Sequence, residues 1–130
     1  MSFAYRSLSA KLHERFPQLS AERYTALVGG ISVDTEPFVL YGVIFNRFLE
    51  ETASSSDDSA KKEVALFLEE MTDSEDGMVA FLLNTEVLPT LVKSQTTISS
   101  LWPILGSATR HRIRLLPPRL LSKIELPSPE

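Results

Sequence analysis

The sequence contains no cysteine, and this absence excludes several kinds of chemistry at once. Disulfide bonds, zinc sites built from thiolates and cysteine nucleophiles are all ruled out. Histidine is nearly as scarce, and we expect His13 and His111 to be exposed bystanders rather than ligands. No H-E-x-x-H metal motif occurs, and no G-x-S-x-G turn presents a serine nucleophile. We therefore predict no enzyme, no catalytic residues, and no bound metal or cofactor.

Long apolar runs are also missing. No run approaches the roughly 18–20 residues that a helix needs to cross a bilayer. The first residues, MSFAYRSLSAKLHERF, space their apolar side chains at helical intervals and contain no apolar core of a secretion signal. This segment predicts the first helix of the fold, and a cytoplasmic location is the simplest expectation.

Strand patterns are absent as well, because no segment alternates apolar and polar residues beside a turn and a partner segment. Apolar residues make up 43% of the chain and charged residues 23%, which is typical of a folded protein. We predict one all-α domain over residues 1–126, an irregular array of about six or seven short helices. Residues 127–130 are expected to form a frayed tail.

One stretch is apolar on nearly every side, from Phe38 to Leu49. A helix of this kind is buried by its neighbours, so we predict that it is the central helix and that Gly42 allows another helix to approach closely. Asp34 or Thr35 is the expected N-cap. Residues 52–60 are expected to form a polar loop. Further stripes predict helices in which Val64, Phe67, Leu68 and Met71, and then Met78, Phe81 and Leu82, share an apolar face.

Charge is unevenly distributed along the chain. Residues 34–86 carry three basic and thirteen acidic side chains, a balance of −10, whereas the segments on either side are mildly basic. Such a block repels nucleic acid and anionic membranes and attracts basic surfaces. We expect Arg110, Arg112 and Arg114 to cap helix carbonyls or pair with acidic residues, and Trp102 to lie in the core.

The stretch FLEEMTDSEDG, residues 67–77, concentrates the negative charge. An EF-hand frame with Gly77 at its sixth position fails, because Leu83 then stands where a glutamate ligand belongs. A capping box of Thr72 with Glu75, or of Asp73 with Asp76, explains the second half of the stretch. It leaves Glu69 and Glu70 unexplained at the end of a helix, where the dipole disfavours a carboxylate by about 0.3–1 kcal/mol.

A similar stretch, NRFLEETASSSDD, occurs nineteen residues earlier. If consecutive helices run antiparallel, the two acidic groups lie at opposite ends of the array. We predict an acidic surface that contacts a basic protein partner. Its candidate residues are, in the main group, Glu69, Glu70, Asp73, Glu75 and Asp76, and in the second group, Glu50, Glu51, Asp57 and Asp58.

Four segments, FPQLSAERY, EPFVLYGVIFNRFLEE, ALFLEEMTDSEDGMVAFLLNTEVLPTL and LWPILGSATR, carry a resemblance. Together they resemble a group of small all-helical bacterial domains, some of which look like immunity proteins encoded beside secreted polymorphic toxins. The resemblance implies a cytoplasmic protein that binds and silences one cognate toxin. A non-enzymatic helical adaptor of a host cellular complex remains the alternative.

Overall fold

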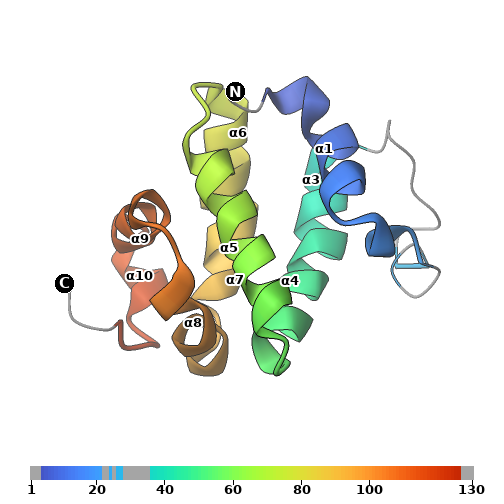
Figure 1. Cartoon of the computed structure of the whole chain (residues 1–130). Helices are drawn as coiled ribbons and strands as arrows, with labels where there is room; N and C mark the ends of the chain where they lie inside the picture. The colour runs from blue at the N-terminus through green and yellow to red at the C-terminus, as the bar shows by residue number, and fades with distance from the viewer. Residues whose placement is uncertain (1–3, 22–23, 25, 28–35, 127–130) are drawn as a thin grey trace.

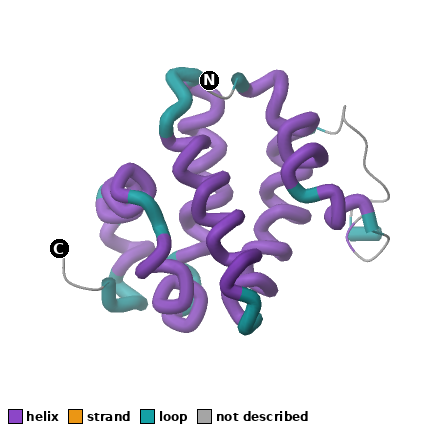
Figure 2. The backbone as a smooth tube through the Cα atoms, in the orientation of Figure 1, coloured by secondary structure: helices purple, strands orange, loops and turns teal. Residues whose placement is uncertain are grey.

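The computed structural model describes residues 4–21, 24, 26–27 and 36–126. Within these ranges every regular element is helical and no strand occurs (Figure 2). The predicted single all-α domain is therefore confirmed. The sequence also predicts a second short helix over residues 21–28, and half of these residues lie outside the described part of the chain. The caps predicted at Asp34 or Thr35 and the predicted frayed tail lie outside it entirely.

The elements are short helices joined by tight corners (Figure 1). In chain order they are the 3-10 helix η1 (Tyr5–Ser7), α1 (Leu8–Arg15), the 3-10 helix η2 (Pro17–Ser20), α3 (Pro37–Val39), the π-helical segment η3 (Leu40–Phe45), α4 (Asn46–Ser54), α5 (Asp58–Thr72), α6 (Gly77–Leu82), the π-helical segment η4 (Leu83–Val87), α7 (Leu88–Leu91), α8 (Gln95–Leu101), the 3-10 helix η5 (Trp102–Ile104), α9 (Ser107–Arg114) and α10 (Pro118–Leu121). In the described part of the chain, none of these helices has the length and apolar character that crossing a membrane requires.

Two pairs of α-helices are each joined by a π-helical segment into one continuous helix. The α3–α4 helix runs from Pro37 to Ser54, and the α6–α7 helix from Gly77 to Leu91. Glu36 is the N-cap of the first, and its carboxylate accepts a hydrogen bond from the Val39 backbone N–H at 3.3 Å. The π-helical segment of the second ends at Val87, two residues before Pro89, which has no backbone N–H to donate to the helical ladder.

Helix α5 lies in the middle of the array (Figure 1). The α3–α4 helix and α1 lie on one side of it, the α6–α7 helix lies behind it, and α8–α10 gather on the other side. The buried Phe67 of α5 lies with its ring centroid 5.2 Å from that of Phe16 and 5.6 Å from that of Phe45. This aromatic cluster joins three elements that are far apart in the sequence. The predicted stripe of Val64, Phe67, Leu68 and Met71 is buried as expected.

The helix around Phe38–Leu49 is less enclosed than predicted. Val39 and Val43 are each 41% exposed, so the prediction that no face meets water is wrong. The reason is that α5 and the α6–α7 helix cover only part of its circumference. The close approach expected at Gly42 is confirmed, because a Cβ added there would lie 2.9 Å from Glu86 Oε1.

The polar loop predicted over residues 52–60 is shorter than expected. Helix α4 continues to Ser54, and Thr52 and Ala53 are buried on its inner face. Helix α5 already begins at Asp58, because the Asp57 carboxylate accepts a hydrogen bond from the Ala60 backbone N–H at 3.0 Å and caps it. Only three residues thus connect the two helices.

Candidate functional site

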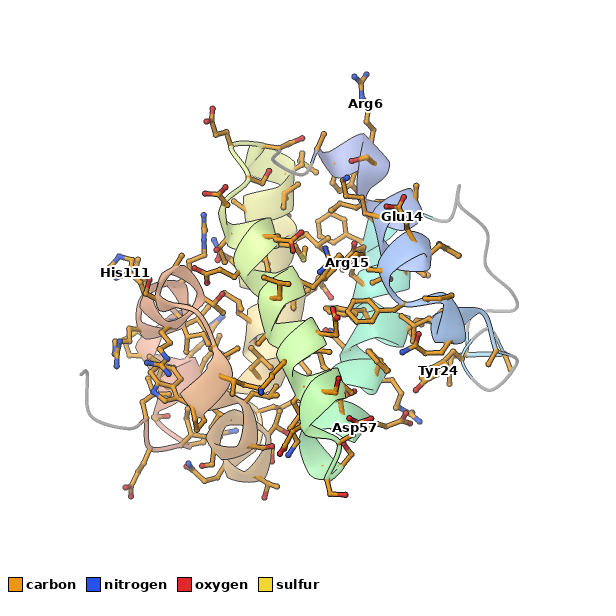
Figure 3. The ribbon with its side chains drawn as sticks, viewed as in Figure 1. Arg6, Glu14, Arg15, Tyr24, Asp57 and His111 are labelled. Atoms are coloured by element: carbon orange, nitrogen blue, oxygen red, sulfur yellow. The ribbon has the colours of Figure 1, made fainter. Side chains whose placement is uncertain are left out.

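The two acidic groups predicted as a partner surface lie at opposite ends of α5. Asp57 marks the α4–α5 corner at one end (Figure 3). The α5–α6 corner lies at the other end (Figure 1). The 15 residues of α5 correspond to roughly 20 Å of helix. The antiparallel arrangement predicted for the two groups is therefore correct, and they form two separate places on the surface.

At the α5–α6 corner, Asp76 caps the N-terminus of α6. Its carboxylate accepts hydrogen bonds from the backbone N–H of Tyr5 at 2.8 Å and of Met78 at 2.9 Å. These two donors, with Tyr5 the stronger cause, hold the pKa of Asp76 below its ordinary value. The predicted capping boxes are wrong, since Asp73 is the C-cap residue of α5 and Asp76 is itself the N-cap. Asp73 and Glu75 keep their charges exposed at the corner.

Glu69, which the sequence left unexplained, caps a different helix. One carboxylate oxygen accepts hydrogen bonds from the Thr109 N–H at 3.0 Å and hydroxyl at 2.8 Å, and the other from the Ala108 N–H at 3.2 Å. The N-cap position of α9 is Gly106, which has no side chain to perform this task. The unfavourable dipole of α5 is thus compensated by the favourable N-terminus of α9. Ser107 is the first residue of α9 and not its cap.

Glu70 pairs with Arg15 across the α1–α5 contact. The Arg15 Nη1 lies 2.7 Å from Glu70 Oε1, and its guanidinium carbon lies 5.3 Å from the centre of the Phe67 ring. Figure 3 shows Arg15 between the two helices. The hydrogen bond to Glu70 is the main cause that raises the pKa of Arg15. This carboxylate therefore contributes to helix packing as well as to surface charge.

Most members of the second acidic group are also engaged. Asp57 caps α5, Glu50 lies 3.7 Å from Lys93 Nζ, and the hydroxyl of Tyr24 donates to Glu51. Asp58 is exposed in the first turn of α5, where a carboxylate suits the helix dipole. Interactions within the fold thus account for most of the second group.

An apolar surface that the sequence analysis missed lies beside the acidic corner. Phe81 is 53% exposed and Met78 is 45% exposed, so the prediction that both share the buried face with Leu82 is wrong. The buried face of this helix consists of Val79, Leu82 and Leu83. Apolar residues on more than one face of α6 were the available signal, because the core needs only one of them.

The exposed apolar residues of two neighbouring helices meet at Phe38. Its ring centroid lies 5.8 Å from that of Phe81, and Val39 and Val43 follow on the same helix. We call the exposed side chains of Val39, Val43, Met78 and Phe81, with the half-buried Phe38 among them, the α6 surface.

Tyr5 donates hydrogen bonds to two acidic residues at the edge of the α6 surface. Its backbone N–H donates to Asp76, and its hydroxyl donates to Glu36, the cap of α3. Burial and this carboxylate raise the pKa of Tyr5 to about 12. The N-termini of α3 and α6 therefore lie at the same end of the molecule (Figure 1). Glu36, Asp73 and Glu75 are exposed there and supply negative charge next to the apolar side chains.

The basic residues of α9 perform structural tasks, as predicted. Arg110 donates to the carbonyl oxygen of Trp102 at 2.8 Å, and Arg112 donates to that of Thr72 at 3.5 Å. The guanidinium carbon of Arg114 lies 4.9 Å from the centre of the Trp102 ring, and Trp102 is buried. Within the described ranges, no three histidine, aspartate or glutamate residues are grouped to hold a metal ion. His111 points outward from α9 (Figure 3).

Comparisons of the chain with models of protein families, with curated proteins and with solved structures find no match.

Proposed function

We propose that this protein is a non-catalytic immunity protein that captures a basic toxin domain on the α6 surface, in the cytoplasm, and thereby neutralises it. The observation that carries the proposal is Phe81, a phenylalanine left 53% exposed beside Phe38 and edged by carboxylates. Large aromatic side chains at the centre of a contact supply most of its binding energy, while charged residues belong at its rim. The α6 surface has both parts.

The charge on the edge specifies the kind of partner. Glu36, Asp73 and Glu75 are exposed next to the apolar side chains, within a segment whose balance is −10. Exposed charges of this kind accelerate association with a basic surface and disfavour acidic partners, including nucleic acid and anionic membranes. A basic protein therefore fits the α6 surface. The resemblance to immunity-type domains is the reason for proposing a toxin as this partner.

The apolar part of the proposal is tested with a matched pair of variants. Phe81→Ser removes the proposed anchor, whereas Leu66→Ser changes a side chain of similar exposure, 52%, on α5 away from the α6 surface. Binding is measured by surface plasmon resonance against the toxin domain encoded beside this gene, in catalytically inactive form. We expect Phe81→Ser to raise the Kd roughly 30-fold or more. Leu66→Ser should leave the Kd unchanged, and equal effects of the two would refute the proposed surface.

The acidic edge is tested by charge reversal at the two ends of α5. Asp73→Lys with Glu75→Lys places positive charge beside the α6 surface, whereas Asp58→Lys places it at the far end. We expect the double variant to slow association about ten-fold at low salt, with the difference shrinking as salt rises. Asp58→Lys should have a much smaller effect. Equal association rates for the double variant and the parent would contradict steering by this edge.

The nature of the partner is tested by the gene neighbourhood and by growth. A secreted toxin gene next to this one, whose expression in the cytoplasm arrests growth unless this protein is present, supports immunity. Loss of that protection in Phe81→Ser, with normal protein levels, would link protection to the α6 surface. A housekeeping operon, with no toxic neighbour, would instead favour an adaptor that uses the same surface for a basic component of a cellular complex.

A further inference from the structure

A pocket of about 400 Å³ lies between the α3–α4 helix and the α6–α7 helix, next to α10. The two helices run parallel to each other, because the chain reverses direction between α4 and α5 and again between α5 and α6. Phe38 accordingly meets Phe81 near their beginnings, and Glu50 pairs with Lys93 near their ends. The volume lies in the range of small-molecule sites. Both π-helical segments contribute lining residues, and π-helical turns are frequent at functional sites.

The buried amide of Asn46 provides an acceptor in the pocket lining. Asn46 is 8% exposed, and its Nδ2 donates to the backbone oxygens of Gly42 at 3.1 Å and of Glu86 at 2.8 Å. These two bonds fix the orientation of the amide. Its Oδ1 is buried and has no hydrogen-bond partner among the residues that the structure describes. The fold thus uses the donors of the amide but leaves its acceptor without a hydrogen bond, which is unfavourable for a buried group.

Three cationic residues also line the pocket. Lys93 follows α7, Arg119 belongs to α10, and Lys123 lies four residues further along the chain. Arg119 and Lys123 are exposed, so their charges are accessible to a ligand. Glu50 pairs with Lys93 from outside the lining, and Glu86 is the carboxylate within it. The pocket lining therefore combines three cationic groups with two acceptors, Asn46 Oδ1 and the Glu86 carboxylate.

We propose that this pocket binds a small anionic molecule that also carries hydroxyl donors, the chemistry of a sugar or polyol phosphate. The phosphate is held by Lys93, Arg119 and Lys123, and a hydroxyl group donates to Asn46 Oδ1. A bare anion satisfies only the cations, and an uncharged polyol satisfies only the acceptors. This site is independent of the α6 surface and does not rest on the immunity proposal.

The experiment is a titration of the ¹⁵N-labelled protein, followed by NMR, with glucose 6-phosphate and glycerol 3-phosphate as probes. Glucose and inorganic phosphate are the controls for each half of the ligand. We expect the phosphate esters to shift the side-chain amide signal of Asn46 and to bind at least ten-fold more tightly than either control. Equal binding of inorganic phosphate would overturn the role of Asn46. No shift around the pocket with either ester at millimolar concentration would overturn the site.

Variants test the phosphate-binding residues and the hydroxyl-binding residue of the site separately. Arg119→Ala with Lys123→Ala changes only exposed side chains and should weaken binding of glucose 6-phosphate at least ten-fold without changing the Tm. Arg6→Ala removes a cation that points away from the molecule at the far end (Figure 3) and should have no effect. Asn46→Leu should abolish the preference for glucose 6-phosphate over inorganic phosphate. Equal losses in Arg6→Ala and in the double variant would mean that only non-specific charge attraction is present. Phe81→Ser should leave the titration unchanged, so failure of either proposal is recognised separately.

Discussion

Replacing Glu69 by alanine removes the cap of a helix that begins 38 residues later in the sequence. Three hydrogen bonds to one carboxylate are lost, from Ala108 N–H, Thr109 N–H and the Thr109 hydroxyl. Loss of an N-cap costs about 0.5–2 kcal/mol, and bonds to a charged acceptor lie at the upper part of that range. We expect the free energy of unfolding to fall by about 1–2 kcal/mol and the Tm by roughly 3–8 °C. Glu75→Ala, an exposed glutamate at the nearby corner, is the control and should change little.

Gly106 offers a second test of this cap, because the lack of a side chain there leaves room for the Glu69 carboxylate. A Cβ added at Gly106 would lie 2.3 Å from both Cδ and Oε1 of Glu69, so Gly106→Ala must expel the carboxylate from the end of α9. In the Glu69→Ala background that conflict no longer exists. The two substitutions should therefore be non-additive, with a coupling of about 1 kcal/mol or more. Gly77→Ala is the matched glycine control, since a Cβ there meets nothing within 4 Å.

The assay is urea unfolding followed by circular dichroism for the parent, the two single variants and the double variant. The expected result is that Gly106→Ala is clearly destabilising alone and mild once Glu69 is alanine. Additive effects of the two substitutions would refute the interhelical cap. So would a Glu69→Ala variant that is as stable as Glu75→Ala.

Three further predictions concern stability. Phe45→Ala removes a fully buried ring packed against Phe67 and should lower the free energy of unfolding by about 3–5 kcal/mol in urea titrations, and a loss below 1 kcal/mol would contradict its packing. The lowered pKa of Asp76 implies stability that is present above its ordinary value of 3.8 and is lost as pH falls through the folded pKa, so Asp76→Asn should flatten the unfolding curve against pH below 4. Arg15→Met should cost roughly 1 kcal/mol at low salt and less at high salt, because it breaks the pair with Glu70, and a salt-independent cost would assign the loss to packing.

The helical class and most core positions could be predicted because they depend on local periodicity. The stripe of Val64, Phe67, Leu68 and Met71 repeats at helical spacing, and any neighbour that buries one of these residues buries the others. Helix ends were less predictable, since several residues compete for each cap. Thr72, Asp73 and Asp76 all suit a cap by type, and the contact of Asp76 with Tyr5, 71 residues away, is formed only by the fold.

The structural tasks of the acidic residues could not be predicted for a related reason. Six of the nine candidates have structural partners, and these are caps for Asp57, Glu69 and Asp76 and pairs for Glu50, Glu51 and Glu70. In four of them, Glu50, Glu69, Glu70 and Asp76, a partner lies more than 35 residues away in sequence, so the sequence shows the charges but not which groups they bind. The dipole conflict at Glu69 and Glu70 was a correct observation. Its explanation lay in α9 and α1 rather than in a partner.

The negative charges and the apolar side chains of the α6 surface are expected to affect different steps of binding. Asp73 and Glu75 are exposed, and such charges contribute mainly to the rate of association. Phe81 and Met78 lose water only when a partner covers them, and their burial therefore acts mainly on the rate of dissociation. A partner that is merely basic would bind briefly, and one that is merely apolar would bind slowly. A partner held by this surface has to present an apolar recess ringed by lysine or arginine, because only that combination uses both features of the α5–α6 corner.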